Sequence, residues 1–161
     1  MLALLTGTGP KPDVGELPAL LAHLPRGLTL RQLLADAGFD SQANHEFVRN
    51  EHGIATLIPA RLGRPSTHGR PPRGSWRRRM RVWLATQRGR RRRGYTQRWQ
   101  VETVMSMIKR NLSEELSGLT RHARNRQMRL HAIVHNIMIL LRPWSFATEQ
   151  DRSGYTAYCW F

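Results

Sequence analysis

Residues 30–60 read LRQLLADAGFDSQANHEFVRNEHGIATLIPA, and this segment determines the predicted fold class. It begins with a compact apolar run that ends at Asp36 and closes with a second apolar run at residues 54–60, and both runs are typical of buried strands. Between them the sequence predicts a helix capped at Ser41 that continues to about His52. A strand, a helix and a second strand in this order form a parallel crossover, so we expect an α/β fold.

Helices are predicted on both sides of this unit. Residues 14–24, VGELPALLAHL, have helical apolar spacing despite a proline. Downstream, one helix is predicted for residues 94–112 and another for residues 121–141, whose apolar second half should be packed. Residues 143–161 have no clear period, so they are expected to form a poorly ordered tail.

The segment between these regions, residues 61–94, is rich in Gly, Pro, Ser and Arg. It is interpreted as an exposed basic connector with one short helical piece at residues 80–86. Trp76 and Trp83 lie among its arginines, a combination that fits phosphate neutralisation with occasional stacking on a base. A solvated connector explains any single arginine about as well. The candidate DNA-binding arginines are Arg77, Arg78, Arg79, Arg91, Arg92 and Arg93.

The charge of the chain indicates its class of partner. The 161 residues include 26 Lys and Arg against 11 Asp and Glu, which gives a formal net charge of +15 at pH 7. Because arginine supplies nearly all of these cations, partners with bidentate phosphate oxygens are favoured, and nucleic acid comes first. An RNA-associated structural protein or a basic disordered arm would have the same balance, so charge alone identifies no reaction.

Cysteine content and hydropathy indicate the compartment. The single cysteine, Cys159, can form neither an intrachain disulfide nor a cysteine-based metal site, which fits a reducing cytosol. The apolar patch at the start of the chain is too short for a signal peptide, and no later stretch reaches about 18 uninterrupted apolar residues. We therefore expect a cytoplasmic protein without a membrane span.

Tyr95, Arg98, Glu102 and Lys109 share a helical spacing. At about 100° of turn per residue, all four fall within an arc of roughly 60°. The spacing therefore predicts a polar ridge, with a carboxylate between cations, beside the apolar face of one helix. The alternative is an ordinary surface helix with i,i+4 and i,i+7 charges.

Asp36 and Glu102 are the best-placed pair of carboxylates. Asp36 ends an apolar run, at the edge where α/β sheets hold ligands, although a simple turn cap explains it equally well. Two carboxylates from separate elements can share Mg²⁺ ions in phosphoryl transfer. Such sites usually need a third acid, and Asp13 and Glu16 are unconvincing because they lie in a proline-broken segment. Asp40 fits a helix cap better than a ligand.

Two motifs resemble one known family. Residues 95–109, YTQRWQVETVMSMIK, match the pattern Y-x2-R-x3-E-x6-K, and residues 33–65 contain A-D-x-G-[YF]-D-S followed by a predicted helix and strand. Both resemble DDE transposases of bacterial insertion sequences, and the similarity covers roughly residues 9–141. The implied fold is ribonuclease H-like, of the retroviral integrase superfamily, with C-terminal helices.

The resemblance also implies roles for individual residues. Asp36 and Glu102 become the second and third metal-binding carboxylates, with Mg²⁺ or Mn²⁺ as the cofactor. Tyr95, Arg98 and Lys109 become supporting residues that contact the DNA end or orient the acid. The implied activity is DNA transposition, by metal-dependent strand cleavage and strand transfer at the ends of an insertion sequence.

In the family that the motifs resemble, the first aspartate lies on an early strand, and from this resemblance we expect that the sequence begins after it. We therefore expect residues 1–142 to be a partial catalytic domain, truncated at the N-terminus, with residues 61–94 as a basic insertion and residues 143–161 as the tail. Little or no nuclease activity is expected from the chain alone. The expected partners are DNA at the bacterial nucleoid and a second copy or a full-length transposase. The alternative is a catalytically dead, basic DNA-binding remnant that modulates a full-length transposase.

Overall fold

A three-stranded parallel sheet forms the centre of the protein. The computed structural model describes residues 1–6, 12–61, 71–141 and 155–158. Within these residues the strand order is β2-β1-β3, so β1 is the central strand. The strands are β1 (Leu30–Leu34), β2 (Ala55–Leu57) and β3 (Tyr155–Tyr158).

The predicted strand, helix, strand unit is confirmed. Helix α2 (Gln42–Glu46) and the π-helical turn η3 (Phe47–Glu51) connect β1 to β2, and these two strands pair in parallel. The hydroxyl of Ser41 accepts the Asn44 N–H at 2.9 Å, as expected of a helix cap. Both strands are shorter than predicted. Strand β1 ends two residues before Asp36, and β2 covers only three residues of the apolar run at residues 54–60.

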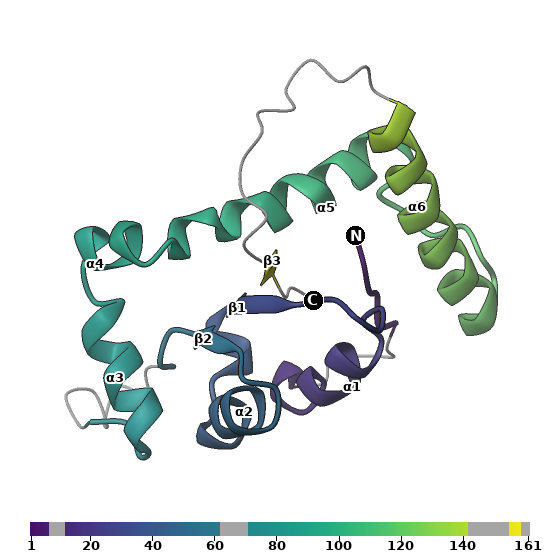
Figure 1. The fold of residues 1–161 in the computed structure, drawn as a ribbon. Coiled ribbons are helices and arrows are strands. Elements are labelled where there is room, and N and C mark those ends of the chain that lie inside the picture. The colour runs from purple at the N-terminus through teal and green to yellow at the C-terminus, as the bar shows by residue number, and fades with distance from the viewer. Residues whose placement is uncertain (7–11, 62–70, 142–154, 159–161) are drawn as a thin grey trace.

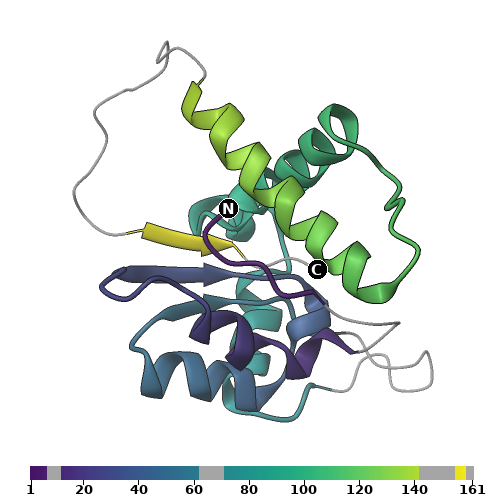
Figure 2. The ribbon, with the colours of Figure 1, turned by 90° about the vertical axis from the view of Figure 1, so that its right-hand side faces the viewer.

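Helices cover both faces of the sheet. Figure 1 shows α1 and α2 on one side of the strands and α5 on the other, and Figure 2 shows the same layers from the side. The remaining helical elements are η1 (Asp13–Gly15), α1 (Leu17–Ala22), η2 (Ala37–Phe39), α3 (Ser75–Trp83), α4 (Gln87–Arg92), η5 (Tyr95–Arg98), α5 (Trp99–Asn111) and α6 (Arg121–Leu141).

The core consists of two clusters separated by β1. Successive side chains of a strand point to opposite faces, so Leu33 packs with α1 and η3 while Leu34 packs on the other face. The second cluster joins Leu34 to Met80 of α3 and to Tyr95 of η5. Burial on both faces is what a parallel sheet requires.

The interpretation of residues 61–94 as an exposed connector is wrong for much of its length. Residues 75–83 and 87–92 form α3 and α4, and residues 62–70 lie outside the described part of the chain. Met80 and Leu84 are buried against the sheet. An apolar residue every fourth position gives this arginine-rich segment a face that can pack.

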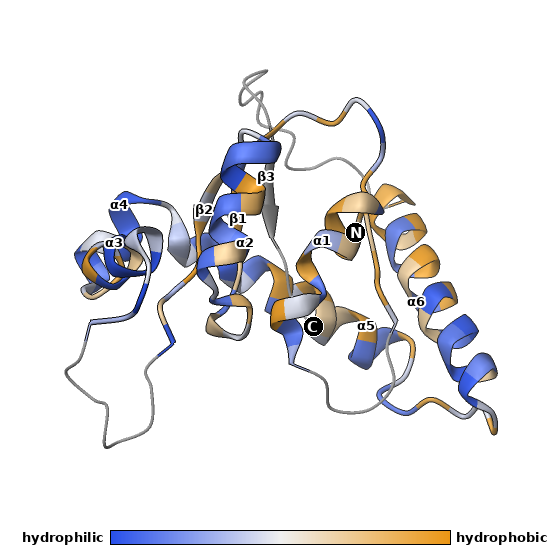
Figure 3. Cartoon of the chain, turned by 90° about the horizontal axis from the view of Figure 1, so that it is seen from below, coloured by the Kyte–Doolittle hydropathy of each residue, from blue (hydrophilic) through white to orange (hydrophobic). Residues whose placement is uncertain are grey.

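Helix α6 has the predicted bounds, but its apolar second half is not packed as predicted. Ala132 and His135 are its buried residues, whereas Leu130, Ile133, Ile137 and Leu140 are all exposed. Figure 3, coloured by hydropathy, shows the change from hydrophilic to hydrophobic residues along this helix. The prediction failed because hydropathy cannot tell whether a neighbouring element covers a helix.

Strand β3 comes from the predicted tail and was not expected. Residues 155–158 pair in parallel with β1, and residues 142–154 and 159–161, including Pro143 and Cys159, lie outside the described residues. Among the helices that the structure describes, none is both long and apolar enough to cross a membrane.

Candidate functional site

Asp36 lies just beyond the C-terminal end of the central strand. Its Oδ1 accepts the N–H of Gly38 at 2.7 Å, and Asp36 is thereby the cap of η2. The turn-cap interpretation of this residue is therefore confirmed. Asp36 is partly exposed, so its carboxylate can be reached from solvent. The hydrogen bond from Gly38 also fixes the orientation of this carboxylate.

Tyr95 joins the start of the Y-R-E-K segment to the end of β1. Its side chain packs in the second core cluster, and its hydroxyl donates a 3.3 Å hydrogen bond to the carbonyl oxygen of Ala35. Burial raises the pKa of the Tyr95 phenol. The residue is therefore a neutral donor at physiological pH, attached to the backbone next to Asp36.

Glu102 and Arg98 form an ion pair on the outside of this junction. Arg98 Nη2 lies 2.7 Å from Glu102 Oε1, and about half of the Glu102 side chain is exposed. Glu102 also lies in the first turn of α5, where the helix dipole favours a negative charge. The i,i+4 neighbourhood predicted for these two residues is confirmed.

The single helical ridge predicted from Tyr95 to Lys109 needs correction. Residues 95–98 form a separate 3₁₀ turn before α5, and Tyr95 is buried in the core, whereas the side chains of Arg98, Glu102 and Lys109 are at least partly exposed. Lys109 pairs with Glu114 at 3.2 Å. Glu102 and Lys109 still share one face of α5, so what needs correction is that the four residues do not lie on one continuous helix and that Tyr95 is buried.

The charges of Asp36 and Glu102 both act on the Tyr95 hydroxyl. Each carboxylate contributes to the raised pKa of this phenol, after burial and against an opposing effect of Arg98, so both acids lie within electrostatic reach of one atom. Carboxylates are the side chains that commonly hold Mg²⁺ together with substrate phosphates. Within the described residues, no group of three His, Cys, Asp or Glu side chains is arranged to hold a metal ion.

Asp13, which the sequence gave little reason to consider, lies beside Asp36. A β-carbon added to Gly38 would stand 2.6 Å from Asp13 Oδ2 and 2.9 Å from Asp36 Oδ1, so the two carboxylates border the same small space. No local signal predicts this arrangement, because it depends on how η1 packs against η2.

Asp40 has a different role from the helix cap predicted for it. Its side chain is fully buried and accepts hydrogen bonds from Arg77 Nε, Arg77 Nη2 and the backbone N–H of Arg61. Arg77, one of the candidate DNA-binding arginines, therefore fastens α3 to the loop before α2. A contact between residues this distant in sequence has no local signal.

A second polar network lies between α2, η3 and β2. The Thr56 hydroxyl accepts a 2.8 Å bond from Arg49 Nε and lies 2.7 Å from Nδ1 of the buried His45. Because the hydroxyl already accepts from Arg49, it is placed to donate to His45. Burial lowers the pKa of His45 to about 4, with Arg49 and Arg77 also lowering it and Asp40 opposing them.

The other candidate arginines lie on the surface of α3 and at the end of α4. Their side chains belong to exposed residues and make none of the ion pairs found among the described residues. This surface therefore combines high positive charge with few acids, which is typical of polyanion binding. The residues are Arg78, Arg79, Arg91, Arg92 and Arg93.

Comparison with known families adds an independent observation. The profile of the family described as transposase DDE domain matches residues 1–137. No curated protein and no solved structure gives a significant match.

Proposed function

Because the chain belongs to the transposase DDE domain family, we propose that it serves DNA transposition through metal-dependent cleavage and joining of DNA strands at insertion-sequence ends. The observation that best supports this proposal is the hydrogen bond from Tyr95 to Ala35. It attaches the segment that contains Glu102 to the strand end that contains Asp36. These are the two acids that the family resemblance assigns to metal binding.

Each side chain near this junction has a proposed task. Asp36 and Glu102 would hold Mg²⁺ or Mn²⁺, which when bound activates a water or 3′-hydroxyl nucleophile and stabilises the leaving oxygen. Gly38 N–H orients Asp36, and Arg98 orients Glu102. Tyr95 positions the two segments relative to each other, and Lys109 is proposed to contact the DNA end once it leaves Glu114.

Binding of Mn²⁺ tests the role of the two acids directly. We expect the electron paramagnetic resonance signal of free Mn²⁺ to fall on addition of the protein and duplex DNA. Glu102→Gln and Asp36→Asn should each weaken this binding by at least roughly 10- to 100-fold, because the loss of residues that only support metal ligands already has effects of that size. Glu115→Gln is the matched control, because Glu115 is an exposed acid near the end of α5. Equal Mn²⁺ binding by all four proteins would refute the site.

Nuclease activity is a separate question from metal binding. Asp13 lies beside Asp36, but among the described residues no group of three His, Cys, Asp or Glu side chains is arranged to hold a metal ion. We therefore expect little or no nicking of supercoiled plasmid by the protein alone. Mn²⁺-dependent nicking that is abolished by Glu102→Gln would show that the chain is competent by itself.

The second candidate function is a basic DNA-binding protein that modulates a full-length transposase. The net charge of +15 and the arginine surface favour it. It predicts salt-sensitive DNA binding that neither metal chelation nor Glu102→Gln alters, because phosphate contacts release counterions whatever the state of the carboxylates. Location at a bacterial nucleoid and homodimer formation stay predictions from the resemblance.

A further inference from the structure

We propose that Arg49, Trp76, Arg79, Trp83 and Arg93 form a surface that binds the sugar–phosphate backbone of duplex DNA, an inference that rests on the DNA-binding part of the proposed function. We call these five residues the Arg–Trp ladder. Arg49 comes from η3, Arg93 follows α4, and the other three lie on α3.

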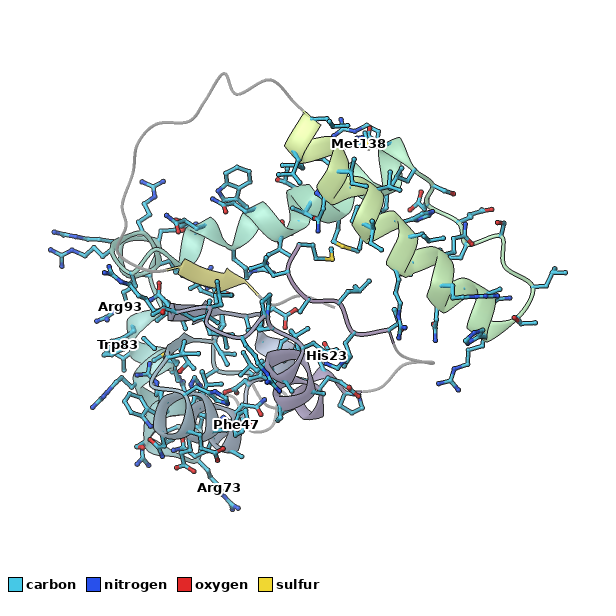
Figure 4. The ribbon with its side chains drawn as sticks, turned by 45° about the vertical axis from the view of Figure 1, so that its right-hand side comes forward. His23, Phe47, Arg73, Trp83, Arg93 and Met138 are labelled. Atoms are coloured by element: carbon cyan, nitrogen blue, oxygen red, sulfur yellow. The ribbon has the colours of Figure 1, made fainter. Side chains whose placement is uncertain are left out.

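The ladder alternates cations with indoles. The guanidinium carbon of Arg49 lies 3.9 Å from the centroid of the Trp76 ring, and that of Arg79 lies 4.7 Å from the same centroid. Arg79 also lies 5.5 Å from the Trp83 ring, whose second neighbour is Arg93 at 3.5 Å. Figure 4 shows Trp83 and Arg93 side by side at the edge of the molecule. Since Trp76, Arg79 and Trp83 are spaced i, i+3 and i+7, they share one face of α3.

Hydrogen bonds and one ion pair fix the segments that contain the ladder residues. Gln42 Oε1 of α2 accepts a hydrogen bond from the backbone N–H of Trp76 at the start of α3. The next residue, Arg77, is held by its ion pair with Asp40. The Arg49 guanidinium donates hydrogen bonds of 2.8 Å to the hydroxyl oxygen and to the carbonyl oxygen of Thr56, which fix its position. Preorganised guanidinium groups lose less conformational freedom when they bind a phosphate.

The charges within the ladder are not compensated by acids. None of the ion pairs found among the described residues involves Arg49, Arg79 or Arg93. Arg49 and Arg79 flank a single indole, close enough for Arg79 to oppose the charge of Arg49. A row of like charges that the protein itself does not neutralise is favourable only with an external polyanion.

The stacking geometry favours the backbone over the bases as the ligand. Each indole already has two guanidinium groups within 5.5 Å of its ring centroid, so a base that stacked on these rings would compete with an arginine. Stacking on free aromatic faces is the usual mode of single-strand binding. The indoles therefore act as spacers that hold arginines, and the arginine edges are left for phosphate oxygens.

Substitution of the indoles tests the ladder without changing the charge. Duplex binding is measured by fluorescence anisotropy in EDTA, so that the metal site has no influence. Trp76→Leu/Trp83→Leu should weaken duplex binding by about three- to tenfold, since each stacked cation gains modestly from its indole. Trp99→Leu removes an exposed tryptophan outside the ladder and should bind like the wild type.

A second pair of variants keeps the test valid if the tryptophan variant does not fold. Arg79→Gln and Arg88→Gln each remove one exposed arginine, but Arg88 of α4 is not in the ladder. We expect Arg79→Gln to weaken binding more than Arg88→Gln and to reduce the salt slope by about one.

Three results would overturn the ladder. Equal binding by Arg79→Gln and Arg88→Gln would mean that only bulk charge matters. A loss confined to single-stranded DNA in the tryptophan variant would mean that bases stack on the indoles. Absence of duplex binding by the wild-type protein would remove the DNA-binding premise as well, whereas wild-type binding with unaffected ladder variants would leave that premise intact.

Discussion

The hydroxyl of Tyr95 donates a 3.3 Å hydrogen bond to the carbonyl oxygen of Ala35, sixty residues earlier in the chain. One residue beyond this carbonyl lies Asp36, and one short turn beyond the tyrosine lies Arg98, the partner of Glu102. The two halves of the proposed metal site are therefore attached to each other through a residue that is itself buried in the core.

Removal of this hydroxyl should cost measurable stability. In Tyr95→Phe the Ala35 carbonyl loses its donor in a buried place, so we expect the free energy of unfolding to fall by about 1–2 kcal/mol in a urea titration. Thr103→Val is the control, because it removes a hydroxyl bonded to Trp99 O on the helix surface. If both variants lost the same free energy of unfolding, the buried Tyr95–Ala35 hydrogen bond would contribute no more to stability than an exposed one.

The Arg77–Asp40 pair should matter more than an exposed pair. Arg77→Met leaves the fully buried Asp40 carboxylate with the Arg61 N–H as its only donor among the described residues, and we expect a loss of about 3 kcal/mol. Glu114→Gln breaks the solvent-exposed pair with Lys109 and should cost less than about 1 kcal/mol. Chemical unfolding followed by circular dichroism compares them, and similar losses would contradict the structural role of Arg77.

His45 should make the protein less stable in mild acid. Its pKa is about 4 in the folded protein and 6.5 in the unfolded chain, so between these values the unfolded chain binds the extra proton. The stability that the protein has with His45 uncharged is therefore fully present above pH 6.5 and is lost as the pH falls toward 4, by an amount on the order of 3 kcal/mol.

Thermal unfolding between pH 4 and pH 7 measures this effect. The pH dependence should become shallower in His45→Gln. It should persist in His52→Gln, because that side chain is already exposed in the folded protein. An unchanged slope in His45→Gln would assign the acid sensitivity to other groups.

Gly38→Ala should disturb the carboxylates at the end of β1. The new methyl group would enter the space between Asp13 Oδ2 and Asp36 Oδ1, so at least one carboxylate must move. We expect Mn²⁺ affinity to fall several-fold, with most of the folding stability retained because short side chains can shift. Gly15→Ala has no atom within 4 Å of its added carbon and is the control. Mn²⁺ titration of both variants decides the matter, and unaltered affinity in Gly38→Ala would separate this space from metal binding.

The parts of the fold that the sequence predicted are those with local signals. Compact apolar runs identified β1 and β2, the cap at Ser41 identified α2, and the bounds of α6 were also predicted from the sequence. The motif assigned Asp36 and Glu102 to metal binding, which stays a prediction, whereas the i,i+4 spacing correctly indicated the Arg98–Glu102 pair.

The parts that could not be predicted depend on contacts between distant segments. β3 has no period of its own and is a strand because β1 offers it an edge. The Arg77–Asp40 ion pair joins α3 to the loop before α2, and the burial of Tyr95 depends on its contacts with the distant residues Ala35 and Leu34. Asp13 reached Asp36 in the same way, through packing alone.

The register of Leu30 with Tyr155 has a consequence for synthesis of the chain. At the usual rate of translation, β1 would leave the ribosome on the order of ten seconds before its β3 partner. Throughout that interval one side of β1 presents unpaired backbone groups, which are prone to pair with other nascent chains. Late closure of the sheet should therefore make the yield of native protein sensitive to chaperone supply and to the speed of elongation.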